Sequence, residues 1–344
     1  MIRICKSLAL LMLVTVFVLR TALSADAAGY KIPAMEPSGA GYLATAMEPS
    51  AAGYLATAVE PPAAGYTMPG AASSAAGYKA PGMHVSSFHK DQAVGGNGVL
   101  IDFSGAEDGY IGVSGQSRGR LKFQVIKDGE TYTYDLKSDG TPSIFPLQLE
   151  DGMYSFRALE NVSGSKYAVL YQTDETITID DSFVPFLCAS DYVNYTEQSA
   201  CVKKAQELAA GAADVNGVIS AVYDYVCKNV TYDKVKAKTV QSGYLPDPDE
   251  TLSTGKGICF DYASLTAAML RSQGIPCKVI FGYVSPNEIY HAWNMFYTEE
   301  KGWVTVKFEI SPKNWNRMDL TFTANGADGT FVGDGSNYKD VYCY

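Results

Sequence analysis

Residues Gly255–Asn294 read GKGICFDYASLTAAMLRSQGIPCKVIFGYVSPNEIYHAWN. From Cys259 onward, small and apolar residues recur at helical spacing until the Gly-Ile-Pro turn at 274–276, which predicts a helix that ends there. The runs Cys277–Tyr283 and His291–Tyr297 each have the length and composition of a strand, and a Pro-Asn turn lies between them. This stretch therefore predicts a helix followed by two neighbouring strands.

Cys259 lies in the first turn of the predicted helix. There, free backbone N–H groups and the positive end of the helix dipole stabilise a thiolate, and the same N–H groups can receive a developing oxyanion. Glycines 255 and 257 remove side chains, so that a substrate backbone can approach closely. His291 follows 32 residues later and is the only histidine in this half of the chain, so it is the one candidate partner for Cys259. A Cys–His pair is typical of acyl-transfer enzymes.

A third group is expected to accept a hydrogen bond from the histidine and to orient its ring. Asp319 is the best candidate, because it follows Trp315 by four residues in the segment NWNRMDLTF. Glu309 is the second choice. A side-chain donor is also expected to complete the oxyanion hole, and Gln241 is the nearest upstream amide.

Four linked motifs occur in order along this half of the chain: G-x-G-x-C-x-D-Y-A, the G-I-P turn, H-A-W-N, and W-x-x-x-D-x-T-F. Together they resemble the transglutaminase-like superfamily of secreted bacterial proteins, over roughly residue 184 to the end. The resemblance implies an α+β fold with a papain-like transglutaminase core, in which a helix bearing the cysteine packs on an antiparallel sheet. It also implies a Cys-His-Asp triad, which maps onto Cys259, His291 and Asp319.

Two features depart from the family pattern. Leu320 stands where the family often has a proline after the aspartate, and 28 residues separate His291 from Asp319, more than is usual. The longer spacing implies an extra strand or hairpin that contains Trp303.

The region 84–182 alternates apolar and polar residues with a period of two, between Gly, Asp and Ser turns. The segment Leu121–Leu136 is an example, because the Asp128-Gly129 pair separates two alternating runs. About seven short strands are predicted, among them separate strands over 167–172 and 176–179, which together indicate a β-sandwich-like domain.

After Ser182 the period becomes helical, and residues 183–344 are predicted to form the catalytic domain. Thr196 is predicted to cap a helix over 200–210, and Asp214 a second helix whose buried face begins at Val215. The acidic, proline-containing segment Tyr244–Glu250 is predicted to be a loop with solvated carboxylates rather than a calcium site.

The N-terminal residues are not typical of a folded domain. Residues 1–27 have a short basic region, an apolar run and an Ala-Asp-Ala cleavage pattern, so we predict a signal peptide and a secreted or cell-surface protein. In residues 28–83, a Gly-Tyr pair recurs every twelve residues between Ala, Gly and Pro. This composition favours a disordered spacer. The alternative is that the tyrosines contact a ligand such as cell-wall glycan, or serve as cross-linking sites.

The formal net charge of −10 argues against nucleic acid and anionic membranes as partners, because both require clustered Lys and Arg. No membrane contact is expected after signal cleavage. With three histidines and no Cys/His cluster of ligand spacing, neither a metal nor a cofactor is predicted. Six of the seven cysteines follow residue 27, and Cys188 and Cys201 are close enough in sequence to form a disulfide.

The sequence therefore predicts an exported cysteine acyl-transfer enzyme that acts on a protein or peptide substrate at the cell wall or surface. Hydrolysis of a peptide or amide bond is the preferred reaction, by analogy with the family. Cross-linking by an amine acceptor is the alternative within the enzyme class. A non-catalytic surface protein that binds the cell wall through its tyrosine repeat is the alternative outside it.

Overall fold

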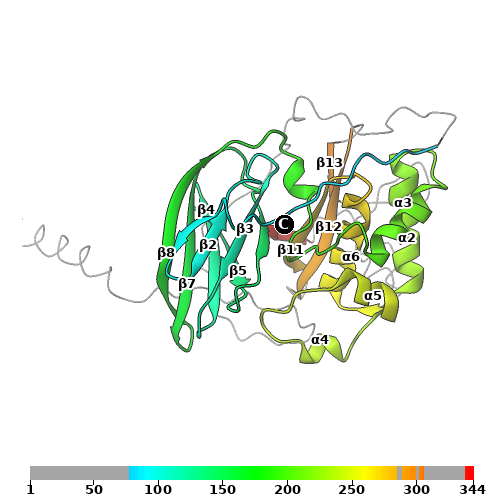
Figure 1. Cartoon of the computed structure of the whole chain (residues 1–344). Coiled ribbons are helices and arrows are strands. Elements are labelled where there is room, and N and C mark those ends of the chain that lie inside the picture. The colour runs from blue at the N-terminus through cyan, green and yellow to red at the C-terminus, as the bar shows by residue number, and fades with distance from the viewer. Residues whose placement is uncertain (1–76, 285–288, 300–301, 306–337) are drawn as a thin grey trace, which may run out of the picture.

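The computed structural model describes residues 77–284, 289–299, 302–305 and 338–344. These residues form a β-rich part and a helical part that carries its own four-stranded antiparallel sheet (Figure 1). The predicted signal peptide, most of the repeat and the two candidate carboxylates Glu309 and Asp319 lie outside the described residues.

Two antiparallel four-stranded sheets make up the β-rich part, in the orders β1-β2-β3-β6 and β5-β4-β7-β8. The strands are β1 Val94–Gly96, β2 Val99–Asp102, β3 Tyr110–Gly115, β4 Leu121–Lys127, β5 Glu130–Leu136, β6 Ser143–Pro146, β7 Gly152–Ser163 and β8 Lys166–Ile177. The predicted hairpin at Asp128-Gly129 is confirmed, and both turn residues have positive φ, 51° and 90°. The two strands expected over 167–172 and 176–179 are one strand, β8, because the polar residues between them continue the pairing with β7.

The helical part has short and long helices: η1 Val184–Phe186, α2 Ala200–Ala209, α3 Val215–Asn229, α4 Lys236–Thr239, α5 Pro248–Thr254 and α6 Cys259–Arg271. A small parallel pair joins β9 Thr231–Tyr232 to β10 Lys256–Gly257. The larger sheet has the order β13-β12-β11-β14, with β11 Cys277–Val284, β12 Ile289–Thr298, β13 Gly302–Thr305 and β14 Tyr338–Cys343. The predicted helix, its two following strands and the extra strand with Trp303 are therefore confirmed. An α+β fold results, with every residue of α6 buried.

Helix caps differ from the prediction in one case. Asp214 caps α3 as expected, since its side chain accepts from the Gly217 N–H at 2.8 Å. Thr196 does not cap α2. Instead, Asp249 of α5 accepts from the N–H groups of Ala200 and Cys201, at 2.9 and 2.8 Å. The segment predicted to be a loop therefore contains a helix start, and Asp249 is not simply solvated.

Replacing Asp249 with asparagine is expected to destabilise the chain by about 1 kcal/mol at neutral pH, because the amide keeps one acceptor but loses the charge. Burial raises the pKa of Asp249, but hydrogen bonds from the two α2 amides outweigh burial and lower it. A carboxylate whose pKa is lower in the folded than in the unfolded chain stabilises the fold at pH values above the unfolded-state pKa, about 3.9. This stabilisation is lost as the pH falls through the folded-state pKa. Urea unfolding of D249N at pH 7 and pH 3 checks this, with the exposed Glu250→Gln as control. If D249N loses the same unfolding free energy relative to the wild type at pH 7 and at pH 3, the stabilising role of the Asp249 charge is contradicted.

One aromatic cluster joins the two parts of the molecule. Tyr344 lies 5.4 Å from Tyr132 and 5.6 Å from Phe281 between ring centroids, and Tyr134 lies 5.6 Å from Tyr192. The β-rich part thus shares a continuous core with the sheet that carries β11 and β12. Contacts of Tyr192 with Phe260, 5.4 Å between centroids, extend this cluster to the first turn of α6.

The last Gly-Tyr pair of the repeat packs on the helical part. The N–H of Tyr78 donates to the Ala212 carbonyl at 2.9 Å, and its hydroxyl donates to the Gln273 carbonyl. Burial raises the pKa of Tyr78 to about 12. Pro81 packs against Gly274, where a Cβ atom would lie 2.1 Å from Pro81 Cγ. This unit of the repeat is an anchor. The earlier Gly-Tyr pairs, and with them the predicted spacer or ligand contact, lie outside the described residues.

Candidate active site

Helix α6 begins at Cys259, which is 2% exposed. The residue before it, Ile258, is the N-cap and has extended backbone angles, φ −95° and ψ 177°. Isoleucine has no side-chain acceptor and is among the poorest N-caps, costing about 1 kcal/mol relative to Ser or Asp. The N–H groups of the first turn are thus not capped by the residue in the N-cap position, and they surround the cysteine.

The two glycines before Cys259 have local structural roles. Gly255 ends α5 with φ 61°, and a Cβ there would lie 2.8 Å from the Asn229 carbonyl. At Gly257 a Cβ would lie 2.6 Å from the Cβ of Asp261. The glycines were predicted to admit a substrate backbone; the contacts show that Gly255 allows the left-handed helix end and that Gly257 makes room for Asp261.

Asp261 is 0% exposed and lies in the same helical turn as Cys259. Its carboxylate accepts from the Ile258 N–H at 2.7 Å, from the Tyr244 hydroxyl at 2.5 Å, and pairs with the Lys236 ammonium at 2.9 Å. Neither Lys236 nor Tyr244 was singled out from the sequence. Tyr244 begins the predicted loop 244–250 and Lys236 precedes it, but no motif links either residue to the cysteine.

His291 lies on β12, opposite Gly282 of β11, and is 5% exposed. Its ring centroid is 6.3 Å from that of Trp293, with which it shares one face of the strand. The other face carries Tyr290 and Asn294, and Asn294 Nδ2 donates to the Ala263 carbonyl of α6 at 3.0 Å. The face of Asn294 is therefore the one that packs on α6.

Tyr290, the residue before His291, is a neighbour of Cys259 that the sequence did not reveal. Burial raises its pKa, and the charges of Tyr342, Tyr283 and Cys259 raise it further. Arg271, at the end of α6, donates to the carbonyl of Cys277, which pairs with Phe296 of β12, so the start of β12 lies towards the Cys259 end of α6.

The remaining candidates fall in three groups. Asp319 and Glu309 lie outside the described residues. Gln241 is exposed, and its Nε2 donates to the Thr239 carbonyl at 2.8 Å, so its amide is bonded within its own loop. Trp293, for which packing was the favoured interpretation, is 2% exposed and contacts Tyr338 edge-on, with 5.0 Å between ring centroids.

Cys277 and Cys188 have environments that suit packing, since both are buried. Cys277 is fully buried, and burial raises the pKa of its thiol to about 12. Burial likewise raises the pKa of Cys188 to about 12. No disulfide forms among the described cysteines, so the pair considered between Cys188 and Cys201 is absent there.

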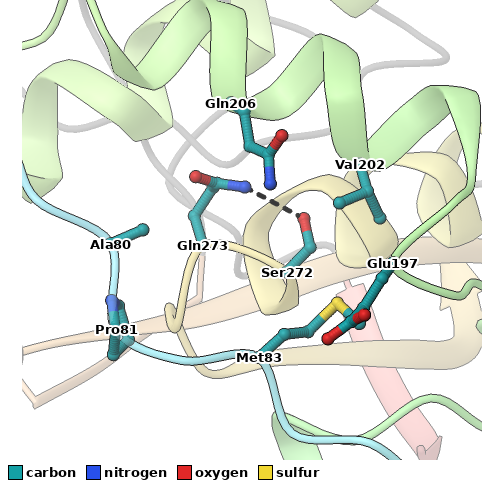
Figure 2. Close-up of a pocket in the computed structure, with 8 residues that line it drawn as sticks. All are labelled: Ala80, Pro81, Met83, Glu197, Val202, Gln206, Ser272 and Gln273. Carbon is teal, nitrogen blue, oxygen red and sulfur yellow. Dashed lines mark hydrogen bonds between the residues drawn. The ribbon is translucent and has the colours of Figure 1, made fainter.

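A cavity of about 320 Å³ lies at the opposite end of α6 (Figure 2). It is lined by Ala80, Pro81, Met83, Glu197, Val202, Gln206, Ser272 and Gln273. Ser272 directly follows the last residue of α6, so this cavity is about 20 Å along the helix from Cys259. We therefore separate it from the chemistry at the cysteine.

Neither a metal-binding cluster nor a helix fit to span a membrane occurs in the described part of the chain. It contains no group of three His, Cys, Asp or Glu side chains placed to hold a metal ion. None of its helices is both long and apolar enough to cross a membrane.

Comparisons with known proteins agree with the motifs. Residues 202–308 match the family model of the transglutaminase-like superfamily. The chain is 37% identical over 67 residues to UPF0252 protein MJ1282 of Methanocaldococcus jannaschii, covering 18% of this chain and 19% of that one. It is 32% identical over 79 residues to a protein-glutamine gamma-glutamyltransferase of Pseudomonas aeruginosa, covering 19% and 12%. The chain thus spans about a fifth or less of the length of these relatives.

Among solved structures, a Cytophaga hutchinsonii protein provisionally named a cysteine protease is similar. It has 16% identity and a TM-score of 0.36, over 73% of this chain and 82% of that one. The family match falls on the segment that contains α6, β11 and β12, where the motifs around Cys259 and His291 lie. Residues 202–308 thus carry a transglutaminase-like core, and it is over this segment that the chain is similar to the transglutaminase-like superfamily.

Proposed function

We propose that the chain is an exported cysteine acyl-transfer enzyme that hydrolyses peptide or amide bonds, with Cys259 as the nucleophile. The supporting observation is that Cys259 begins a buried helix whose N-cap, Ile258, has no side-chain acceptor. A poorly capped helix start is unfavourable by itself. It is useful where the first-turn N–H groups must bind the oxyanion that forms during attack on a carbonyl.

The proposed reaction has two halves. Cys259 Sγ attacks the carbonyl carbon while the His291 imidazole holds the thiol proton; the C–N bond then breaks, and His291 gives the proton to the leaving amine. Water next attacks the thioester, loses a proton to His291, and releases a carboxylic acid with the regenerated thiol. Asp319 is proposed to accept from the other ring nitrogen of His291.

The placement of β12 supports a role for His291 at the cysteine end of α6, because Phe296, further along β12, pairs with Cys277, which accepts from Arg271 at the other end of the helix. His291 shares a strand face with Trp293, opposite to the Asn294 face that packs on α6, so the proposal requires the imidazole to reach Cys259 Sγ from the far face of β12. A His291 variant tests this requirement independently of Cys259.

Cross-linking is a second candidate, and the similarity to a protein-glutamine gamma-glutamyltransferase favours it. In that reaction a primary amine replaces water in the second half, and an isopeptide bond forms instead of a carboxylate. The same Cys259 thioester serves both reactions, so the acceptor alone separates them.

The test is to incubate the mature chain with casein and a labelled primary amine, and to read both products by mass spectrometry. Peptide fragments, or glutamine converted to glutamate without label, are the expected result for hydrolysis. Label on glutamine indicates cross-linking. If neither product exceeds that of the Cys259→Ala chain over a panel of unfolded protein substrates, the proposed acyl transfer is wrong. N-terminal sequencing of the exported form tests cleavage after residue 27.

A further inference from the structure

The first turn of α6 contains two groups whose charges oppose each other's ionisation. Cys259 must become a thiolate to act as nucleophile, and Asp261, two residues later, is a carboxylate without solvent exposure. An anion near a helix N-terminus is favourable. A second anion in the same turn, however, disfavours the thiolate, because like charges raise each other's proton affinity.

Lys236 supplies the compensating charge. Its ammonium lies 2.9 Å from one carboxylate oxygen of Asp261 and donates to the Tyr244 hydroxyl at 2.5 Å. The Tyr244 hydroxyl in turn donates to the other carboxylate oxygen at 2.5 Å, and the ammonium lies 4.4 Å from the centre of the Tyr244 ring. The three side chains thus each contact the other two, and they form a closed cluster that includes Asp261 of the turn that carries Cys259.

The backbone fixes Lys236 relative to the residues before Cys259. Asp233 accepts from the N–H groups of Val235 and Lys236, the N-cap and first residue of α4, at 2.9 and 2.8 Å. Directly before Asp233, β9 pairs with β10, which leads directly into Ile258 and α6. Lys236 therefore has a defined position in the same local framework as the cysteine, although a quarter of its side chain remains exposed.

We propose that Lys236 is a positioning residue for the nucleophile: its ammonium neutralises Asp261, holds that carboxylate under the first turn of α6, and leaves the helix N-terminus free to stabilise the Cys259 thiolate. Tyr244 locks the pair through its hydroxyl. The inference rests on the proposed role of Cys259, but its test needs no substrate.

Other charged and titratable groups surround this cluster and stay unchanged in the test. They are Asp233 before α4, Lys256 of β10, and Asp247 and Glu250 at the start of α5, together with Tyr290 of β12, which interacts with Cys259 itself. A neutral substitution at Lys236 therefore removes one positive charge while the other charged groups around Cys259 stay the same.

The experiment measures the rate of iodoacetamide addition to Cys259 against pH, by mass spectrometry, in the full mature chain. Lys236→Met is expected to move the midpoint upward by about one pH unit, which is about a tenfold lower rate below the midpoint. Lys238→Met is the matched control, since Lys238 is exposed on the same short helix, and it is expected to leave the profile unchanged. Lys236→Arg is expected to restore most of the rate.

The double variant Lys236→Met/Asp261→Asn separates charge from structure. Removing the carboxylate as well restores neutrality, so its midpoint is expected to return towards that of the wild type. It also keeps the inference testable if Lys236→Met alone fails to fold, as judged by circular dichroism. A profile unchanged by Lys236→Met, or a midpoint that stays raised in the double variant, would overturn the inference. A wild-type chain with a reactive Cys259 but no acyl transfer would instead overturn the proposed function alone.

Discussion

A chain with alanine at Cys259 is expected to lose acyl transfer by at least about a thousandfold, because the thioester cannot form without the sulfur. Substrate binding and the first-turn N–H groups remain. Without the sulfur, however, no tetrahedral intermediate forms for these groups to stabilise. The side chain is small and 2% exposed, so its removal is expected to cost only about 1 kcal/mol of stability. Initial rates on a peptide substrate, together with thermal unfolding, measure both effects.

Cys277→Ala is the matched control for this variant. Cys277 is also buried, but it begins β11 and contacts Asn294 Nδ2 at 3.6 Å rather than facing a helix start. We expect a comparable loss of stability with activity within a few-fold of the wild type. Equal losses of activity in the two variants would assign the effect to packing and would contradict a nucleophilic role for Cys259.

Replacing Arg271 with methionine is expected to be the most destabilising single change in the helical part. Arg271 ends α6, is 0% exposed, and donates to the carbonyls of Cys277, Cys188 and Tyr344 at 2.8, 2.8 and 3.1 Å. Burial lowers the pKa of its guanidinium. Methionine fills part of the volume but removes all three hydrogen bonds at once, while the Tyr344 oxygen keeps a second donor, the Val279 N–H; we expect a cost of about 3–5 kcal/mol.

Such a loss corresponds to a decrease in Tm on the order of 10 °C for a protein of this size. Arg271→Lys is the informative comparison, because lysine keeps the charge but cannot direct donors at three separate carbonyls. We expect it to recover only a small part of the stability. If calorimetry shows Arg271→Met within 1 °C of the wild type, the three hydrogen bonds do not hold this end of α6.

The sequence around Cys259 predicts its own local structure well, since helix period, turn residues and strand length all agree there. The helix starts at Cys259 as expected, and β11 and β12 follow within a few residues of their predicted bounds. The sequence of α5 also contains the signals of a helix start, although this segment was predicted to be a loop. Asp247 caps this helix, Pro248 occupies its first turn, and Asp249 and Glu250 follow, which is a typical helix start.

Contacts between distant segments could not be predicted in the same way. Asp249 caps α2 across 48 and 49 residues of sequence, and nothing near Thr196 indicates this. Lys236 follows β9 and Asp261 follows β10, and the pairing of these two strands brings their segments together, so that both residues meet Tyr244. Likewise, strand alternation implies that His291 and Asn294 lie on opposite faces, but only the contact with Ala263 shows which face packs on α6.

The central claim is that His291 activates Cys259, and the pH dependence of iodoacetamide addition tests it most directly. Cys259 and Cys277 are both buried, so exposure alone does not distinguish their rates. We predict that Cys259 reacts much faster than Cys277 near neutral pH, and that His291→Asn moves the midpoint for Cys259 upward. Equal rates for the two thiols, or a Cys259 profile unaffected by His291→Asn, would contradict the account.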